Sequence, residues 1–310
     1  MDLTTSGSAS VLKPAAALTD SGDAAAAAPE GSPPALPESP LVTIEPGRSA
    51  GVGALRDLWH FRELLYFLVW RDIKVRYKQT ALGVAWVVMQ PLLTTVVFSV
   101  FLGVVAGIRA DGDVPYPVFV FAGMLPWTFF SSAIATSGNS LVGSSHLITK
   151  VYFPRVIIPM AAVGGRLVDF LVSFVVMGLM LAFYRVAPSW NLLMLPPLVL
   201  LLALLALSVG MWASASNVRY RDVGAILPVL VQLWMFASPV VYPLSMVPPK
   251  WRTLYSLNPL VGVIAGFRSA LLGQAFDWGA LAFSAGVTAA LVVFAALTFR
   301  RMEKHFADLV

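Results

Sequence analysis

Two charged residues inside a long apolar run are the first feature of this sequence that could do chemistry. Arg166 and Asp169 stand three residues apart in the stretch "GGRLVDF". Side chains at this spacing share one face of a helix, so the two charges can neutralise each other. Charges at membrane depth face a bundle interior or a wet cavity. We interpret them as an intramembrane charge pair that is structural, with a role in a transport pathway as the alternative.

Catalytic chemistry has little support elsewhere in the chain. The histidines, His60, His146 and His305, are far apart and lack the spacing or neighbouring acids of a metal or acid–base site. The sequence contains no cysteine, which excludes disulfides and thiolate chemistry. It contains no Gly-Lys pair, which excludes a phosphate-binding loop of the G-x-x-x-x-G-K-[ST] type. We therefore expect no catalytic residue, no metal and no cofactor in this chain; any ATP is hydrolysed by another chain.

Composition indicates the solvent in which these residues act. Hydrophobic residues make up 58% of the 310 positions and charged residues 12%, with a mean hydropathy of +0.79. The apolar residues form runs of about 20, the length of a helix that crosses a hydrocarbon core, rather than the alternation of a membrane barrel. The predicted fold class is an all-α integral membrane protein.

Six runs are predicted to cross the membrane: residues 84–108, 116–138, 156–184, 191–216, 223–241 and 279–299. With the amino terminus in the cytoplasm, thirteen loop and flanking Lys or Arg residues lie inside and five outside. This asymmetry follows the positive-inside rule and accounts for the net charge of +5 without nucleic acid. Both termini are therefore expected in the cytoplasm.

The segments around the spans have distinct compositions. Residues 1–54 are rich in Ala, Pro, Gly and Ser, which predicts a disordered tail. Residues 55–82 place apolar positions at helical spacing between charges, which predicts an amphipathic helix in the interface. The transmembrane domain covers residues 83–299, and 300–310 form a cytoplasmic tail. The loops 139–155 and 217–222 are interpreted as docking elements or, equally well, as plain basic connectors.

The stretch before the last span is apolar but too short to cross. The segment "PLVGVIAGFRSALLG", residues 259–273, has about 15 residues. A crossing here would also move the basic end "RRMEKHF" outside, against the charge rule. We expect a re-entrant pair of short helices over about residues 242–275, on the outer side. Arg268 in the second helix is expected to snorkel to the outer headgroups or to face an exit.

Four stretches resemble the membrane subunits of polysaccharide-exporting ABC transporters, the group of O-antigen, capsule and teichoic acid exporters. They are "RDIKVRYKQTALGVAWVVMQPLL" (71–93), "ITKVYFPRVIIPMAAV" (148–163), "NVRYRDV" (217–223) and "LNPLVGVIAGFRSALLG" (257–273). The resemblance covers about residues 57–305. It implies a permease in the bacterial inner membrane that moves a lipid-linked polysaccharide, most readily of O-antigen type, through a channel between two copies of itself. Two separate ATPase subunits would bind ATP and Mg.

The resemblance also assigns roles to particular residues. The interface helix and the two loops would couple to the ATPase through Arg71, Asp72, Lys74, Arg76, Leu147, Lys150, Arg219, Arg221 and Asp222. Leu82 and Gly83 match a leucine-glycine loop near the channel entrance. Aromatic side chains accept the C–H faces of sugars, although they also anchor helices at the interface. The candidates for the channel and substrate path are Leu82, Gly83, Tyr116, Trp127, Phe129, Phe130, Trp251, Tyr255, Phe267 and Arg268.

Two alternatives compete with this hypothesis. An ABC exporter of a small molecule or lipid shares the broad architecture. A membrane glycosyl- or acyltransferase belongs to another class, and it needs convergent acid–base or metal-binding groups that the sparse histidines and carboxylates do not provide.

Overall fold

The computed structural model describes residues 58–78, 84–112 and 114–303. The chain divides into two units, Met1–Arg48 and Ser49–Val310, and every described residue lies in the second. The predicted tail over residues 1–54, the Leu82–Gly83 loop and most of the carboxyl-terminal tail lie outside the described residues.

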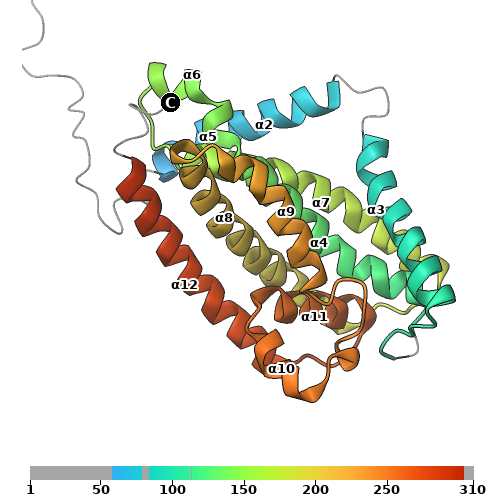
Figure 1. Cartoon of the computed structure of the whole chain (residues 1–310). Coiled ribbons are helices and arrows are strands. Elements are labelled where there is room, and N and C mark those ends of the chain that lie inside the picture. Colours follow the sequence, from blue (N-terminus) through green and yellow to red (C-terminus); the bar gives the residue numbers. More distant parts are fainter. Residues whose placement is uncertain (1–57, 79–83, 113, 304–310) are drawn as a thin grey trace, which may run out of the picture. The chain divides into compact units, whose positions relative to one another are not determined.

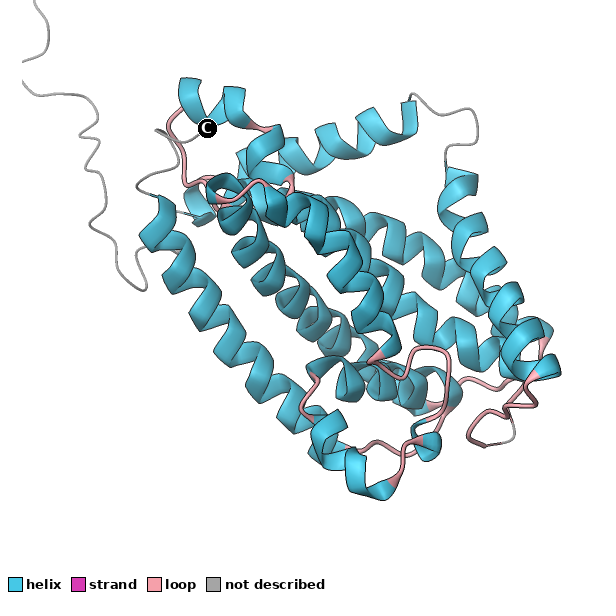
Figure 2. Cartoon of the chain, viewed as in Figure 1, coloured by secondary structure: helices cyan, strands magenta, loops and turns pink. Residues whose placement is uncertain are grey.

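All regular secondary structure in the described part of the chain is helical, as the sequence predicts (Figure 2). The elements are α2 (Arg62–Lys78), α3 (Val84–Phe98), η1 (Ser99–Val105), α4 (Tyr116–Gly138), α5 (Ser140–Gly143), α6 (Ser145–Lys150), α7 (Ile157–Phe183), η2 (Trp190–Met194), α8 (Leu195–Arg219), α9 (Asp222–Phe236), η3 (Leu244–Met246), α10 (Pro249–Ser256), α11 (Pro259–Leu272) and α12 (Trp278–Glu303).

Five helical segments among the described residues are long and apolar enough to cross a membrane. They are Ala85–Val105, Tyr116–Gly138, Ile157–Phe183, Trp190–Arg219 and Trp278–Glu303. The sixth predicted crossing, residues 223–241, is shorter as a helix, because α9 ends at Phe236 after 15 residues. At a rise of 1.5 Å per residue α9 is about 22 Å long, less than the roughly 30 Å of a hydrocarbon core. The described part of the chain thus contains five long apolar spans and two shorter apolar helices, α9 and α11.

Helix α4 forms the centre of the bundle. Within its apolar stretch 78% of the residues are buried, whereas the other four spans have 11–28% buried. It packs against α7, α8, α11 and α3, with α9 along its side (Figure 1). A helix that is apolar all round belongs inside a bundle, and the less buried spans present apolar surface to lipid or to other chains.

The two ends of the bundle carry different elements. Figure 1 shows α2, α5 and α6 at one end and α10 at the other, with α9 running between them. Helix α11 packs closely on α12 at Gly262, where a Cβ would lie 2.3 Å from Ser284 Oγ and 2.4 Å from the Ala280 carbonyl oxygen. The end of α12 is fixed to the connection before α7: the Arg155 backbone N–H donates to Glu303 Oε1 at 3.1 Å, and the Arg155 guanidinium donates to the Glu303 carbonyl.

Candidate functional site: a polar cluster between α2 and α7

Helix α2 is docked on the rest of the protein around Leu68, while its larger apolar side chains Tyr66 and Phe67 are exposed. Leu68 is 3% exposed and belongs to a second hydrophobic cluster, separate from the one around α4. Two glycines on α7 make the contact close: a Cβ on Gly164 would lie 3.0 Å from Val69 Cγ2, and one on Gly165 would lie 3.9 Å from Asp72 Cβ. Small residues at this crossing therefore bring the polar side chains of α2 within reach of α7.

Asp169 on α7 is the centre of a polar cluster at this crossing. It pairs with Arg166 on its own helix, with Arg166 Nη1 at 3.3 Å from Asp169 Oδ2. Its carboxylate also accepts hydrogen bonds from the Arg76 guanidinium and the Tyr77 hydroxyl, both on α2. Arg166 Nε donates to Thr136 Oγ1 on α4 at 2.8 Å. The structure thus extends the expected charge pair into a network that joins three helices.

The electrostatics of the cluster favour a structural role over catalysis. Two arginines meet one carboxylate, and the exposed fractions of the Arg76, Arg166 and Asp169 side chains are 23%, 27% and 13%. The pKa of Tyr77 is raised from 10.0 to about 12, first by burial and then by its hydrogen bond to Asp169. The hydroxyl therefore stays protonated and donates at physiological pH. The cluster ties α2 to the bundle and offers no nucleophile or acid–base pair.

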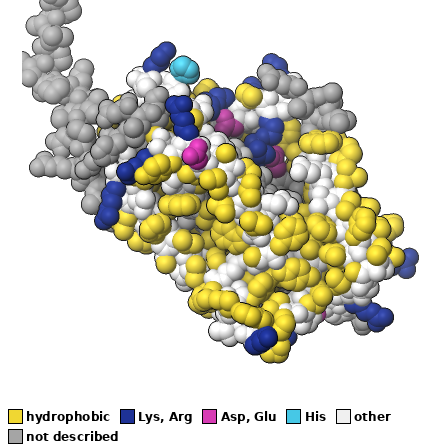
Figure 3. Space-filling model, viewed as in Figure 1, with side chains coloured by type: hydrophobic (Ala, Val, Ile, Leu, Met, Phe, Trp, Pro, Cys, Tyr) yellow, Lys and Arg dark blue, Asp and Glu magenta, His cyan; other side chains and the backbone are white. Residues whose placement is uncertain are grey.

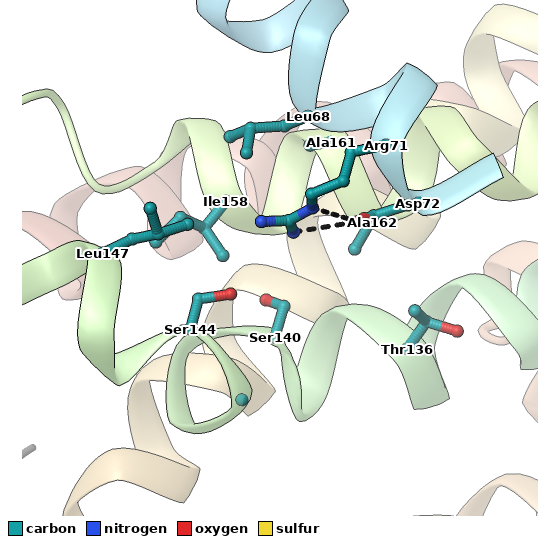
Figure 4. Close-up of a pocket in the computed structure, with 11 residues that line it drawn as sticks. Leu68, Arg71, Asp72, Thr136, Ser140, Ser144, Leu147, Ile158, Ala161 and Ala162 are labelled. Atoms are coloured by element: carbon teal, nitrogen blue, oxygen red, sulfur yellow. Dashed lines mark hydrogen bonds and ion pairs between the residues drawn. The ribbon is translucent and has the colours of Figure 1, made fainter. Parts of the chain in front are cut away.

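A cavity of about 140 Å³ lies beside the cluster, between α2, α4, α5 and α7 (Figure 4). The Arg71 guanidinium points into it and donates from Nε and Nη2 to Asp72 Oδ1, at 3.0 and 2.9 Å. The Ser140 and Ser144 side chains lie on the opposite wall, and Leu147 on α6 also lines the space. The contact between α2 and α5 is therefore loose, whereas that between α2 and α7 is tight.

The coupling residues expected from the sequence fall into two groups. Arg76 is engaged by Asp169, Arg71 and Asp72 pair with each other, and Leu147 is half-buried. The remainder are exposed on α2, at the end of α6 and at the turn between α8 and α9: Lys74, Lys150, Arg219, Arg221 and Asp222. In the face shown in Figure 3, Lys and Arg side chains gather mainly at the end that carries α2, α5 and α6, above a broad apolar surface.

The turn between α8 and α9 is held by an asparagine that the sequence did not single out. Asn217 Nδ2 donates to the Gly138 carbonyl at 3.0 Å, and Asn217 Oδ1 accepts from the Gly224 backbone N–H at 3.0 Å. This side chain joins α8 to the end of α4 and to the start of α9. A buried asparagine must find hydrogen-bond partners. The sequence signal for this role was its position in the polar turn "NVRYRD".

The expected path residues do not form one surface. Trp127, Phe129, Phe130 and Phe267 are buried inside the subunit, and Phe129 and Phe267 both pack against Phe170. A residue that lines a channel between two subunits needs exposed surface on each one, so in this conformation these four have a packing role. Trp251 is 52% exposed, Tyr255 is half-buried, and Tyr116 bonds the Val241 carbonyl at 2.7 Å.

Arg268 is buried rather than at the surface that snorkelling to the headgroups requires: it is 5% exposed and its guanidinium lies 3.7 Å above the ring of Phe119. An arginine can remain inside the protein when carbonyl oxygens and an aromatic face replace its hydration, which sequence spacing does not reveal.

An open groove of about 500 Å³ lies where α9 ends and α10 begins. Trp234, Trp251 and Tyr255 contribute to its walls together with Asn258. Trp234 Nε1 donates to Asn258 Oδ1 at 3.1 Å, which fixes the orientation of its ring. Nothing in the sequence distinguishes Trp234 within its continuous apolar run, so it was not among the predicted path residues.

The fold and these two regions define a helical membrane protein: long apolar spans, a helix docked at one end and a short helical segment with an aromatic groove at the other. The chain matches the ABC-2 type transporter family over residues 63–272, and it belongs to that family. It is a multi-pass membrane protein.

Several individual proteins are also similar in sequence to this chain. The chain is 30% identical over 258 residues to the O-antigen export system permease protein RfbA of Myxococcus xanthus. The aligned region covers 82% of this chain and 98% of the relative. A protein of the same name from Klebsiella pneumoniae is 26% identical over 255 residues, covering 82% and 97%. The polysialic acid transport protein KpsM of Escherichia coli is 25% identical over 207 residues, covering 65% and 78%.

Proposed function

We propose that this chain is the permease subunit of an ATP-driven exporter. The exporter moves a lipid-linked polysaccharide of the O-antigen type out of the cytoplasm across the bacterial inner membrane. The observation that carries the proposal is the match to O-antigen export permeases over 82% of this chain and 97–98% of the relatives' length. Two copies enclose the channel, and two separate ATPase subunits bind ATP and Mg and drive its opening.

The distribution of side chains supports a division of labour between the two ends. Exposed basic residues at α2, α6 and the α8–α9 turn suit an acidic surface on the ATPase. Because α2 is bound to α7 through Asp169, a movement of α2 reaches the third span directly. The ATPase therefore docks at this end, which is the cytoplasmic one.

The course of α9 supports six traversals of the membrane. Helix α9 starts next to the end of α8 and runs to the end where α10 lies (Figure 1). The non-helical chain after Phe236 adds length to the 15 helical residues of α9, so that the two together can cross the hydrocarbon core. With six traversals both termini are cytoplasmic, and the segment from 242 to 275 is a re-entrant gate at the outer exit.

The aromatic groove is suited to a sugar polymer. Apolar C–H faces of sugars stack on indole and phenol rings without tight binding of any one unit, which lets a polymer slide. Trp251 and Tyr255 from the sequence hypothesis remain in the path, and Trp234 joins them because it lines the same groove. Small-molecule export is the competing function and requires no extended aromatic surface.

Reconstitution with the cognate ATPase tests the proposal. The chain and ATPase are placed in proteoliposomes with candidate lipid-linked polysaccharides, and the polysaccharide that reaches a lectin on the opposite side is measured. We expect ATP-dependent transfer and stimulated hydrolysis, with an ATPase subunit unable to hydrolyse ATP as the matched control. Transfer of a free lipid or small molecule without transfer of any polysaccharide would establish the alternative.

A further inference from the structure

The chain between α9 and α10 is unwound in apolar surroundings. Helix α9 ends at Phe236, and Ser238, Val240 and Val241 are all buried. Helical hydrogen bonding stops soon after Phe236, and Pro239 and Pro243 supply no backbone N–H, so the carbonyls of this segment lack the donors that a continuing helix would provide. Irregular backbone at membrane depth is tolerated only where the protein itself satisfies the polar groups. Side chains must therefore replace the missing donors.

Side chains from α4 and from the N-cap of α11, together with one from the unwound segment itself, donate to several carbonyls of this chain. Asn258 Nδ2 donates to the Ala237 carbonyl at 2.9 Å, and Tyr116 on α4 donates to the Val241 carbonyl at 2.7 Å. The Tyr242 hydroxyl donates to the Phe236 carbonyl at 2.7 Å. The unwound segment is thus tied to the bundle at several points along its length.

Arg268 makes the most deeply buried of these contacts. Its Nη2 donates to the Val240 carbonyl at 2.8 Å, and its Nη1 lies 3.5 Å from the Tyr242 carbonyl oxygen. Gly123 on α4 leaves the space, because a Cβ there would lie 2.3 Å from the Val240 carbonyl oxygen and 2.6 Å from Arg268 Nη2. No carboxylate among the described residues lies within 4.0 Å of this guanidinium. Carbonyl oxygens and the Phe119 ring therefore stabilise its charge.

We propose that Arg268 is a positioning residue for export: it holds the unwound segment of residues 237–243 against α4 and α11, and so fixes where α10 and the aromatic groove stand. Both bonded carbonyls lie in the chain between α9 and α10, so Arg268 determines the angle between these two helices. The link to export rests on the proposed function, whereas the hold on the segment does not.

The chain lacks cysteine, so one introduced thiol reports on this segment. Val240→Cys is buried and should react slowly with a membrane-impermeant maleimide, added on whichever side labels the exposed Lys250→Cys. We expect Arg268→Met to raise the Val240→Cys labelling rate about tenfold or more, because a buried carbonyl left without its donor favours local opening. Arg268→Lys keeps one donor and should give a smaller rise.

Arg252 is the matched control. It is an exposed arginine that also bonds loop carbonyls, with Nε 3.0 Å from the Val247 carbonyl oxygen and Nη2 3.4 Å from that of Ser245. Water can replace these bonds, so Arg252→Met should change labelling by less than about twofold. Equal labelling in Arg268→Met and Arg252→Met, or continued protection of Val240→Cys in Arg268→Met, would overturn the proposal.

Two further measurements keep the test decisive. If Arg268→Met does not accumulate, two milder variants replace it: Arg268→Lys, and Tyr116→Phe, which removes a single hydroxyl donor to the same segment. Increased labelling of Val240→Cys in both variants supports the proposal. Protection of Val240→Cys in both variants overturns it. Export is measured in the same variants: increased labelling with unchanged export overturns the role in transport. If the unsubstituted protein exports no polysaccharide, the proposed function fails while the labelling result stands.

Discussion

Replacing Asp169 by asparagine tests whether the polar cluster holds α2 on α7. The carboxylate accepts from Arg76 and Tyr77 on α2 and pairs with Arg166 on α7. Hydrogen bonds to a charged group contribute about 1.5–3 kcal/mol each, but these side chains are 13–27% exposed and an amide retains one acceptor. We therefore expect Asp169→Asn to weaken docking by about 2 kcal/mol.

Cysteine labelling measures this loss. Leu68 lies on the docked side of α2 and is 3% exposed, so Leu68→Cys reacts only when α2 lifts away. A loss of about 2 kcal/mol raises the population of the lifted state, and hence the labelling rate, roughly 30-fold. Asp72→Asn is the matched control: Asp72 is half-buried and pairs within α2, with Arg71, so its substitution should change the rate less than about twofold.

Two results would refute the reasoning. Equal labelling in Asp169→Asn and Asp72→Asn would mean that apolar packing alone holds α2. A double-mutant cycle between Arg76→Gln and Asp169→Asn gives the second test, since directly bonded residues lose less together than the sum of their separate losses. Simple additivity in that cycle would show that the two side chains do not interact in solution.

Three further outcomes are expected. Gly123→Ala should lower thermal stability and export together, because its methyl group would displace the Val240 carbonyl and the Arg268 guanidinium; unchanged melting would contradict the close contact. Trp251→Ala should slow polysaccharide transfer about tenfold while assembly is unaffected, and Trp278→Ala, an equally exposed tryptophan outside the groove, should leave transfer unchanged. Binding of the proposed ATPase partner should weaken as ionic strength rises, measured by co-purification, because the proposal assigns the contact to exposed basic side chains; a salt-independent affinity would refute that assignment.

Local spacing made several features predictable. Apolar length indicated the spans, and the spacing of Arg166 and Asp169 placed both on one helix face. Helical spacing of apolar residues predicted a helix within residues 55–82, and α2 occupies Arg62–Lys78 of that range with Leu68 buried. Each of these inferences depends on residues within a few turns of each other, where helix geometry fixes the neighbours.

Contacts between distant segments were not predictable in the same way. Tyr77 and Asp169 are 92 residues apart, and nothing in the sequence pairs them. The burial of Arg268 depends on space left by Gly123, 145 positions earlier in the chain. The early end of α9 depends on Pro239 together with donors from α4 and α11, so hydropathy alone placed the crossing too far along the chain.

The bond between Arg155 and Glu303 places a constraint on how the last span can vary. Each residue inserted into α12 would turn Glu303 by about 100° and shift it about 1.5 Å along the axis. The carboxylate would then leave the Arg155 backbone N–H that it now meets at 3.1 Å. Sequence drift in α12 should therefore change its side chains but not its length, and adaptation to a thicker bilayer must come from tilt or from the other spans.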